Sequence, residues 1–189
     1  MTAPAHSKLD DEELLHLAIE ASRSGRHGDA IEYLKEAAAK PESNAKVHFL
    51  LGAEHAQIGL FDRAAEGMGA ALKLDPGLVP ARFQLGLLYL VRGKPGEAAS
   101  VWKPLDSLPD SDPYLHFKRG LESLARDDFA ACKESLTRGL ALNRSNVPLN
   151  RDMQRILDEV AARETASAGD LSGDPSEHVL LSAYTRKPH

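Results

Sequence analysis

One stretch of 34 residues decides how this chain folds. Residues 45–78 read AKVHFLLGAEHAQIGLFDRAAEGMGAALKLDPGL. Apolar residues recur every three or four positions on both sides of Gly59, which is the spacing of an amphipathic helix. Because a glycine interrupts the pattern and a Pro-Gly pair closes it, the stretch predicts a helix over 45–58, a tight turn, and a second helix over 61–74.

The same residue types return when the sequence is shifted by 34 residues. Small residues recur at Ala18, Gly52, Gly86 and Gly120, and again at Ala30, Ala64, Ala98 and Cys132. Bulky apolar residues recur at Leu34, Met68, Trp102 and Leu136, and turn-forming residues at Gly25, Gly59, Gly93 and Asp127. A small residue lets two helices cross closely, while a bulky one fills the space beside them. The chain is therefore predicted to hold four equal units, at 11–44, 45–78, 79–112 and 113–146, after a short N-terminal lead at 1–10.

Each unit is expected to be a pair of helices. The first helices are predicted at 11–24, 45–58, 79–92 and 113–126, and the second helices at 27–40, 61–74, 95–108 and 129–142. Residues 147–163 carry Met153, Ile156, Leu157 and Val160 at helical spacing, which predicts a helix that caps the last unit. Residues 164–189 are expected to form a flexible linker, over 164–177, and an apolar C-terminal tail, over 178–189.

The period and several residues of the second unit resemble the tetratricopeptide-repeat (TPR) family. The matching residues are Leu51-Gly52, Gly59-Leu60-Phe61, Ala64, Ala71 and Asp75-Pro76, and the resemblance covers residues 11–146. It implies an all-α fold, a right-handed superhelix of four helix-turn-helix repeats with the capping helix and flexible tail. Arg82 and Arg119 stand where the family usually has an apolar or aromatic residue. The resemblance further implies a protein–protein interaction scaffold or adaptor that is not an enzyme.

The resemblance also indicates which residues line the concave wall of such a superhelix. They are Leu15, Ile19, Phe49, Ala53, Phe83, Leu87, Leu90, Phe117, Leu121 and Leu124. None is Lys, Arg or Asn, which argues against the carboxylate-binding mode of TPR co-chaperones. The apolar columns predict a peptide-binding groove for an apolar peptide or helix of a protein partner. The alternative is that neighbouring helices pack on these columns and bury them.

The C-terminal tail supplies a second candidate site. Its apolar motif consists of Val179, Leu180, Leu181 and Tyr184, at the end of the 14-residue linker. A linker of that length reaches about 20 Å, so the motif is within range of a groove on its own chain or on a sister molecule. The alternatives are an unattached end or a signal that another protein reads.

Two narrower functions are consistent with the same features. One is a secretion-type chaperone that shields a hydrophobic client segment, because such TPR chaperones are small, acidic and cytoplasmic. The other is a structural homo-oligomer, such as a homodimer, closed by the groove or by the C-terminal tail.

Composition excludes several classes of partner and chemistry. The net charge is -5 and the chain has no basic run, which disfavours nucleic acid and anionic membrane surfaces as partners. The N-terminus lacks the apolar segment of a signal peptide, and a single cysteine, Cys132, cannot form an internal disulfide, so we expect a cytoplasmic protein. His48 and His55 lie about 10.5 Å apart along a helix, too far to share one metal ion. We therefore expect no catalytic residue, no metal and no cofactor.

Overall fold

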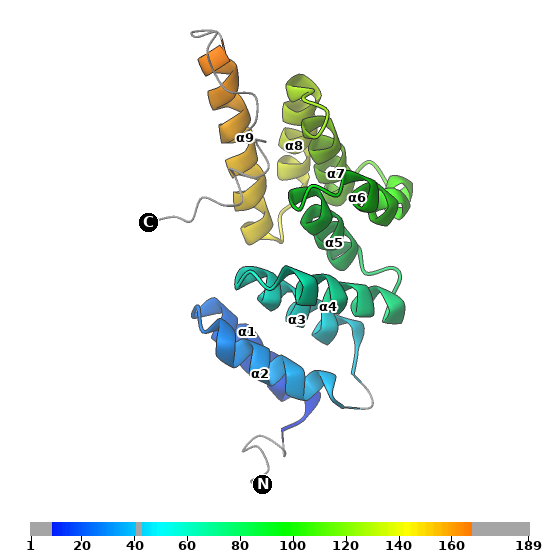
Figure 1. The fold of residues 1–189 in the computed structure, drawn as a ribbon, viewed down its shortest axis with the longest axis vertical. Helices are drawn as coiled ribbons and strands as arrows, with labels where there is room; N and C mark the ends of the chain where they lie inside the picture. The colour runs from blue at the N-terminus through cyan, green and yellow to red at the C-terminus, as the bar shows by residue number, and fades with distance from the viewer. Residues whose placement is uncertain (1–8, 41–42, 168–189) are drawn as a thin grey trace. The chain divides into compact units, whose positions relative to one another are not determined.

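The chain folds into helices throughout the part that the structure describes. The computed structural model describes residues 9–40 and 43–167, and the side chains of these residues as far as Arg163 (Figure 1). Over these ranges it contains nine α-helices, one 3-10 helix and no β-strand. The predicted all-α class is therefore confirmed. The chain divides into two compact units, residues 1–88 and 89–189, with the boundary inside the fifth helix.

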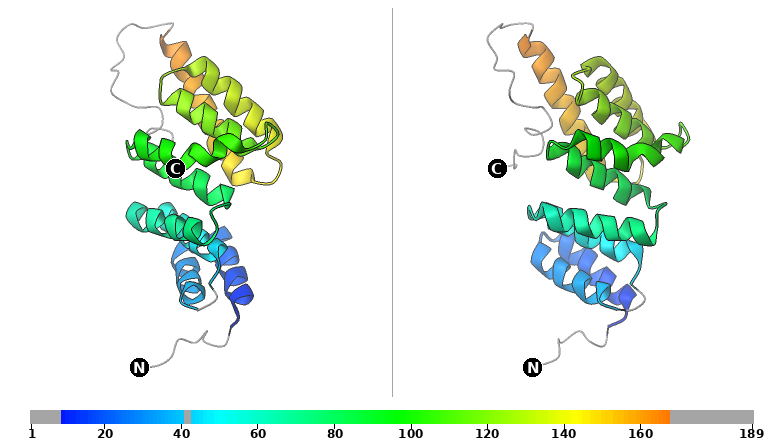
Figure 2. Two further views of the ribbon diagram at one scale, coloured as in Figure 1. Left: turned by 90° about the vertical axis from the view of Figure 1, so that its right-hand side faces the viewer. Right: turned by 45° about the vertical axis from the view of Figure 1, so that its right-hand side comes forward.

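The first unit contains two pairs of antiparallel helices. They are α1 (Asp11–Arg23), α2 (His27–Ala38), α3 (Ala45–Gln57) and α4 (Phe61–Leu74), followed by the start of α5 (Val79–Val91). Helix α1 packs against α2, and α3 against α4, as the views of Figure 2 show. Helix α2 also contacts α3, so the two pairs share one core around Leu14, Leu34 and Val47.

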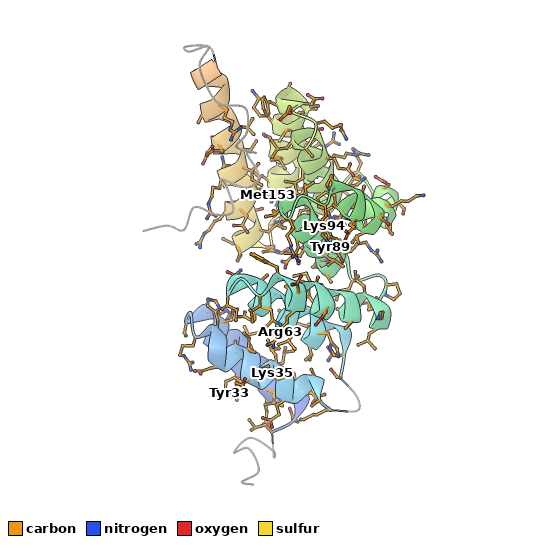
Figure 3. The ribbon with its side chains drawn as sticks, in the orientation of Figure 1. Tyr33, Lys35, Arg63, Tyr89, Lys94 and Met153 are labelled. Carbon is orange, nitrogen blue, oxygen red and sulfur yellow. The ribbon has the colours of Figure 1, made fainter. Side chains whose placement is uncertain are left out.

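The second unit contains the remaining helices. After the end of α5 come α6 (Pro95–Trp102), a 3-10 helix η1 (Lys103–Ser107), α7 (Pro113–Leu124), α8 (Phe129–Leu142) and α9 (Val147–Ser167). Helices α7 and α8 form the antiparallel pair, and α9 packs against α8. Helix α9 buries Met153, which Figure 3 labels, together with Ile156 and Val160. These three residues are among the apolar residues from which a capping helix was predicted.

The observed helices begin at the residues that the repeat predicts, and all but two end within two residues of the predicted position. The predicted repeat 79–112 differs, because α6 ends at Trp102 rather than continuing to residue 108. Pro104 has no N–H to donate within an α-helix, so the chain continues as the 3-10 helix η1. Helix α9 runs to Ser167 instead of residue 163, because no glycine or proline interrupts the sequence before Gly169.

The turns within the pairs share one hydrogen-bond pattern. Gly25, Gly59, Gly93 and Asp127 have positive φ angles of 72°, 77°, 71° and 58°. In each turn the next residue donates its N–H to the carbonyl five residues before it, from Arg26 to Ala21, Leu60 to His55, Lys94 to Tyr89 and Asp128 to Ser123, at 2.8–3.0 Å. This is the helix ending that a residue in the left-handed region allows. The turn column is thus confirmed.

The two arginines that depart from the TPR pattern have polar partners. The guanidinium of Arg82 donates to the carbonyl of Pro76 at 2.7 Å, and Arg119 forms an ion pair of 3.4 Å with Asp110. Both partners precede the helix that carries the arginine. The side chains therefore join a helix to the loop before it.

One close helix contact in the first unit is a contact between backbones. A Cβ atom added to Gly67 of α4 would lie 2.9 Å from the Cα of Gly52 on α3, and one added to Gly52 would lie 2.8 Å from the carbonyl oxygen of Ala64. Real Cβ atoms do not approach other heavy atoms so closely, so only glycine fits at both positions. In the second unit the corresponding contact involves a side chain, because Leu136 lies against the backbone of Gly120.

Substitution of two neighbouring glycines tests this backbone contact. We expect Gly67→Ala to lower the free energy of unfolding by about 1–3 kcal/mol, because the backbone of α3 must move away. Gly69→Ala is the control, since no atom lies within 4 Å of a Cβ at Gly69. Alanine there favours the helix and raises stability by about 0.5–1 kcal/mol. Urea denaturation followed by circular dichroism measures both, and equal effects would contradict the proposed contact.

The turn residue Asp127 gives a second test of stability. We expect Asp127→Gly to raise the free energy of unfolding by about 1 kcal/mol, because glycine adopts a positive φ without steric cost. The reciprocal variant is Gly93→Asp, at the equivalent turn, where a Cβ atom would meet nothing within 4 Å. It should lose a similar amount. A gain in Gly93→Asp would show that the backbone angle does not determine stability here.

Candidate functional site

Four of the predicted groove residues lie on α1 and α3 and are half-buried. Leu15 and Ile19 lie on α1, and Phe49 and Ala53 lie on α3. Each pair is separated by four residues, so its two side chains share one face of their helix. Leu15 also packs against the buried cluster around Leu14 and Ala18. We call these four residues the apolar stripe.

The other six predicted groove residues are buried. Phe83, Leu87 and Leu90 lie on α5, and Phe117, Leu121 and Leu124 lie on α7, with exposed fractions of at most 8%. The ring of Phe117 fills the space above Gly139 of α8, where an added Cβ would lie 2.5 Å from two ring atoms. These six side chains contribute to packing in this structure, and their contact with a ligand stays a prediction.

The apolar tail motif lies outside the described residues. This applies to Val179, Leu180, Leu181 and Tyr184 alike. Its docking in a groove stays a prediction.

An exposed apolar patch at the α3–α4 turn was not predicted from the sequence. Ile58, Leu60 and Phe61 retain 45%, 41% and 43% of their surface. They flank Gly59, whose turn ends α3 and starts α4. The available signal was that these large apolar residues flank a predicted tight turn. A tight turn has few neighbouring residues that can bury a large side chain.

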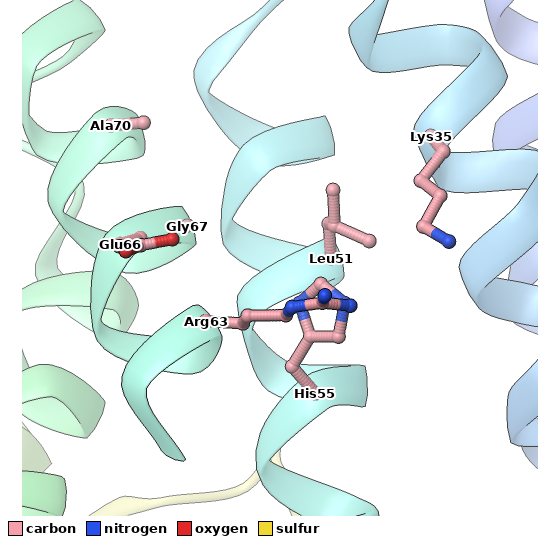
Figure 4. Close-up of a pocket in the computed structure, with 7 residues that line it drawn as sticks. All are labelled: Lys35, Leu51, His55, Arg63, Glu66, Gly67 and Ala70. Atoms are coloured by element: carbon pink, nitrogen blue, oxygen red, sulfur yellow. The ribbon is translucent and has the colours of Figure 1, made fainter. Parts of the chain in front are cut away.

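A hollow of about 380 Å³ opens on the first unit between α2, α3 and α4 (Figure 4). Its lining consists of Lys35 from α2, Leu51 and His55 from α3, and Arg63, Glu66, Gly67 and Ala70 from α4. On α4, Glu66, Gly67 and Ala70 follow Arg63 by three, four and seven positions and so lie on the same helix face. Figure 4 shows Arg63 extending from α4 toward the ring of His55, with Lys35 extending from α2.

The imidazole of His55 is the most unusual group in this hollow. His55 is 6% exposed, and neither ring nitrogen has a hydrogen-bond partner among the described residues. Burial, followed by the charges of Arg63 and Lys35, lowers the pKa of His55 below its usual value, while Glu66 acts in the opposite direction. A buried polar group without a partner typically costs about 1–3 kcal/mol. The hollow therefore contains a neutral imidazole that is free to accept or donate a hydrogen bond.

Sequence reasoning considered His55 only as a metal ligand. The residues at the equivalent positions of the other three 34-residue repeats are Ala21, Tyr89 and Ser123, so the repeat gives no common role to this position. Lys35 and Arg63 belong to different predicted units, and their proximity depends on how α2 packs near α4. The repeat therefore gave no signal for this site, and the one available signal was the residue type of His55 itself.

A second polar cluster joins the two helix pairs. The hydroxyl of Ser22 donates to one oxygen of the Glu54 carboxylate at 2.5 Å, and Nδ1 of His27 lies 2.8 Å from the other oxygen. Glu54 is 7% exposed. A hydrolytic triad needs its serine against its histidine, whereas here each contacts the carboxylate instead. The cluster links α1, α2 and α3, and explains why Ser22 is polar although the equivalent residues of the later repeats, Ala56, Leu90 and Leu124, are apolar.

Cys132 is a packing residue. It is buried in the small-residue column, and burial, with a smaller effect of Asp128, raises the pKa of its thiol to about 11. Thiolates are the reactive form of cysteine, so this thiol is unreactive near neutral pH.

The described ranges contain neither a metal-binding cluster nor a membrane-spanning helix. No group of three His, Cys, Asp or Glu side chains within residues 9–40 and 43–167 is arranged to hold a metal ion. Among the helices of these same ranges, none combines the length and apolar character needed to cross a membrane. The expected lack of catalysis, metal and cofactor stays a prediction.

The lowered pKa of His55 predicts a pH effect on stability. Between the folded and unfolded pKa values, the unfolded chain binds a proton that the folded chain does not. The free energy of unfolding should therefore fall as the pH drops below 6.5, the usual histidine value, by at most about 1.4 kcal/mol per pH unit. Above that pH this contribution is constant.

The variant His55→Gln should lose this part of the pH dependence, because glutamine does not titrate. His16→Gln is the matched control, since His16 is an exposed histidine of α1. Urea denaturation of the two variants and the parent chain between pH 7.5 and 5.5 gives the three slopes. Identical slopes for His55→Gln and the parent chain would contradict the inferred protonation state.

Comparison with known proteins shows the fold. No protein-family model matches the chain. Among curated proteins, the chain is similar to "Small glutamine-rich tetratricopeptide repeat-containing protein 2" of Saccharomyces cerevisiae (strain ATCC 204508 / S288c), with 25% identity over 167 residues. The match covers 88% of this chain and 44% of the relative, so the chain spans less than half the length of that protein.

Solved structures with the same fold include three of MamA. "MamA 41-end from Desulfovibrio magneticus RS-1" is 19% identical with a TM-score of 0.59, covering 82% of this chain and 85% of that one. "MamA RS-1 ArsTM double mutant" is 18% identical with a TM-score of 0.58, covering 84% and 89%, and "Crystal structure of MamA" is 20% identical with a TM-score of 0.56, covering 85% and 82%. With the relative named for its tetratricopeptide repeats, these structures show that the chain has a TPR-type all-helical fold.

Proposed function

We propose that this protein is a binding scaffold that holds an apolar segment of a protein partner. The observation that carries the proposal is the apolar stripe of Leu15, Ile19, Phe49 and Ala53. Its four side chains keep part of their surface exposed, although each has an apolar character that normally favours full burial. The similarity to a tetratricopeptide-repeat protein supports a scaffold over an enzyme.

The stripe is suited to apolar anchors rather than to charged groups. An anchor that is well buried on binding contributes about 1.5–3 kcal/mol, so two or three are enough for micromolar affinity after the costs of association. A helix or an extended segment can supply anchors at the required spacing. The proposal therefore specifies the chemistry of the partner segment and not its sequence.

Narrower versions of this function belong to the same proposal. In one, the partner segment is part of a secreted client that the protein shields as a chaperone. In another, the segment comes from a second copy of this chain. Light scattering of the full chain over a range of concentrations distinguishes them, because the second version requires a concentration-dependent mass.

Site-specific crosslinking in the native cell tests the position of the docking surface. A photoreactive phenylalanine analogue at position 49 should capture a partner, and one at position 61 should capture it far less. Both positions hold phenylalanine in the same unit, but Phe49 belongs to the apolar stripe while Phe61 lies at the exposed α3–α4 turn. Mass spectrometry of the crosslink then identifies the captured segment.

A synthetic peptide of the captured segment gives the affinity. We expect Phe49→Glu to weaken its binding at least about tenfold, or about 1.4 kcal/mol, because a carboxylate replaces an apolar contact. Phe61→Glu should change the affinity less than about twofold, and circular dichroism verifies that both variants remain helical. Loss of binding in Phe61→Glu alone would place the docking surface at the α3–α4 turn and overturn the proposal.

A further inference from the structure

The hollow between α2, α3 and α4 contains a buried group without a partner. His55 is 6% exposed and borders the hollow, and neither of its ring nitrogens has a partner in the described part of the chain. Buried polar groups in folded proteins are nearly always hydrogen-bonded. The volume of about 380 Å³ lies in the range of ligand pockets. A ligand group that enters the hollow can therefore satisfy the imidazole.

The charges around the hollow define the ligand's charge. Lys35 on α2 and Arg63 on α4 are cationic, and Glu66 on α4 is anionic. Lys35 also forms an exposed ion pair of 3.0 Å with Glu32, which lies outside the lining, and its ammonium has two further N–H donors for a ligand. With a neutral His55, the lining has one net positive charge. A singly charged anion balances this charge, whereas a phosphate dianion would leave an excess of negative charge next to Glu66. The ligand's charged group is thus expected to be a monoanion.

The remaining walls define what carries that group. Leu51, Gly67 and Ala70 are apolar or lack a side chain. They offer contacts to a short hydrocarbon stem, and the hollow is larger than an isolated carboxylate requires. Gly67 is essential to this shape, because its close contact with Gly52 sets how near α4 comes to α3.

We propose that the hollow binds the carboxylate of an aspartate or glutamate side chain from a partner polypeptide. Arg63 and Lys35 pair with the carboxylate, and the ring N–H of His55 donates to it from the floor of the hollow. The stem of the side chain packs against Leu51 and Ala70. The assignment rests on the cavity, the unpartnered imidazole and the two cations.

This site is separate from the apolar stripe. On α3, Leu51 lies two positions after the stripe residue Phe49, and His55 lies two positions after the stripe residue Ala53. Two positions correspond to about 160° around a helix. The two surfaces therefore lie on nearly opposite faces of the helix. The inference goes beyond the proposed scaffold function and does not depend on it.

Nuclear magnetic resonance of the full chain tests the site with defined probes. The probe is N-acetyl-leucyl-glutamate with an amidated C-terminus, and its control is the same dipeptide with glutamine. We expect the glutamate probe to shift the His55 ring resonances saturably, and to bind at least about tenfold more tightly than the glutamine probe, because the carboxylate makes charge-assisted hydrogen bonds. The affinity should also fall with added salt.

Three outcomes with these ligands would overturn the proposal. They are the absence of a saturable shift, equal binding of the two dipeptides, and tighter binding of inorganic phosphate than of the glutamate probe. Sodium acetate is the fourth ligand. Binding of acetate as tight as that of the dipeptide would overturn the assignment to a polypeptide side chain.

A pair of charge variants on α4 separates a local contact from overall charge. Arg63→Gln removes a cation from the hollow, and Lys73→Gln removes one from an exposed position outside it. We expect Arg63→Gln to weaken the glutamate probe at least about fivefold, and Lys73→Gln to change it less than about twofold. Both residues are exposed, so both variants should fold. Equal losses in the two variants would show attraction by net charge alone and would overturn the site.

Discussion

The close crossing of paired helices is the constraint on which this structure depends. In the first unit the backbones of α3 and α4 touch at Gly52 and Gly67, and in the second unit Gly120 admits the side chain of Leu136 of α8. Glycine within a helix costs about 1 kcal/mol relative to alanine. The contact between the helices offsets that cost because dispersion and burial act over the whole length of each pair.

The same packing decides which apolar residues are available to a ligand. Phe117 and Phe49 occupy equivalent positions in the 34-residue repeat, yet Phe117 is fully buried while Phe49 keeps part of its surface exposed. At Phe117, Gly139 leaves room for the ring between α7 and α8, whereas Phe83 is buried although Leu105 stands at the position equivalent to Gly139. At the position equivalent to Gly139, α4 has Ala71. Helices α3 and α4 instead make their close contact at Gly52 and Gly67. Equivalent residues in a repeat therefore need not have equivalent functions.

Helix α3 combines two kinds of surface. One face contributes Phe49 and Ala53 to the apolar stripe, and a nearly opposite face contributes His55 and Leu51 to the charged hollow. A short helix can present two kinds of surface when its neighbours on each side differ. Helix α3 has α1 and α2 of the preceding pair on one side and its own partner α4 on the other. The buried Glu54, held by Ser22 and His27, fixes α3 against the first pair between these two faces.

The sequence by itself determined where the helices begin, the pairing of α1 with α2, α3 with α4 and α7 with α8, and the turns. A period of 34 residues repeats small, bulky and turn-forming residues, and each of these types acts locally, through helix propensity, backbone angle or the contact between neighbours in the chain. Pro104 was the local exception, because one missing N–H ends α6 early. Tertiary structure alone decided the exposure of the predicted groove residues and the existence of the hollow at His55. Burial and cavity shape depend on the distance between helices that lie far apart in sequence, and that distance is set by the sum of many side-chain volumes rather than by any single residue.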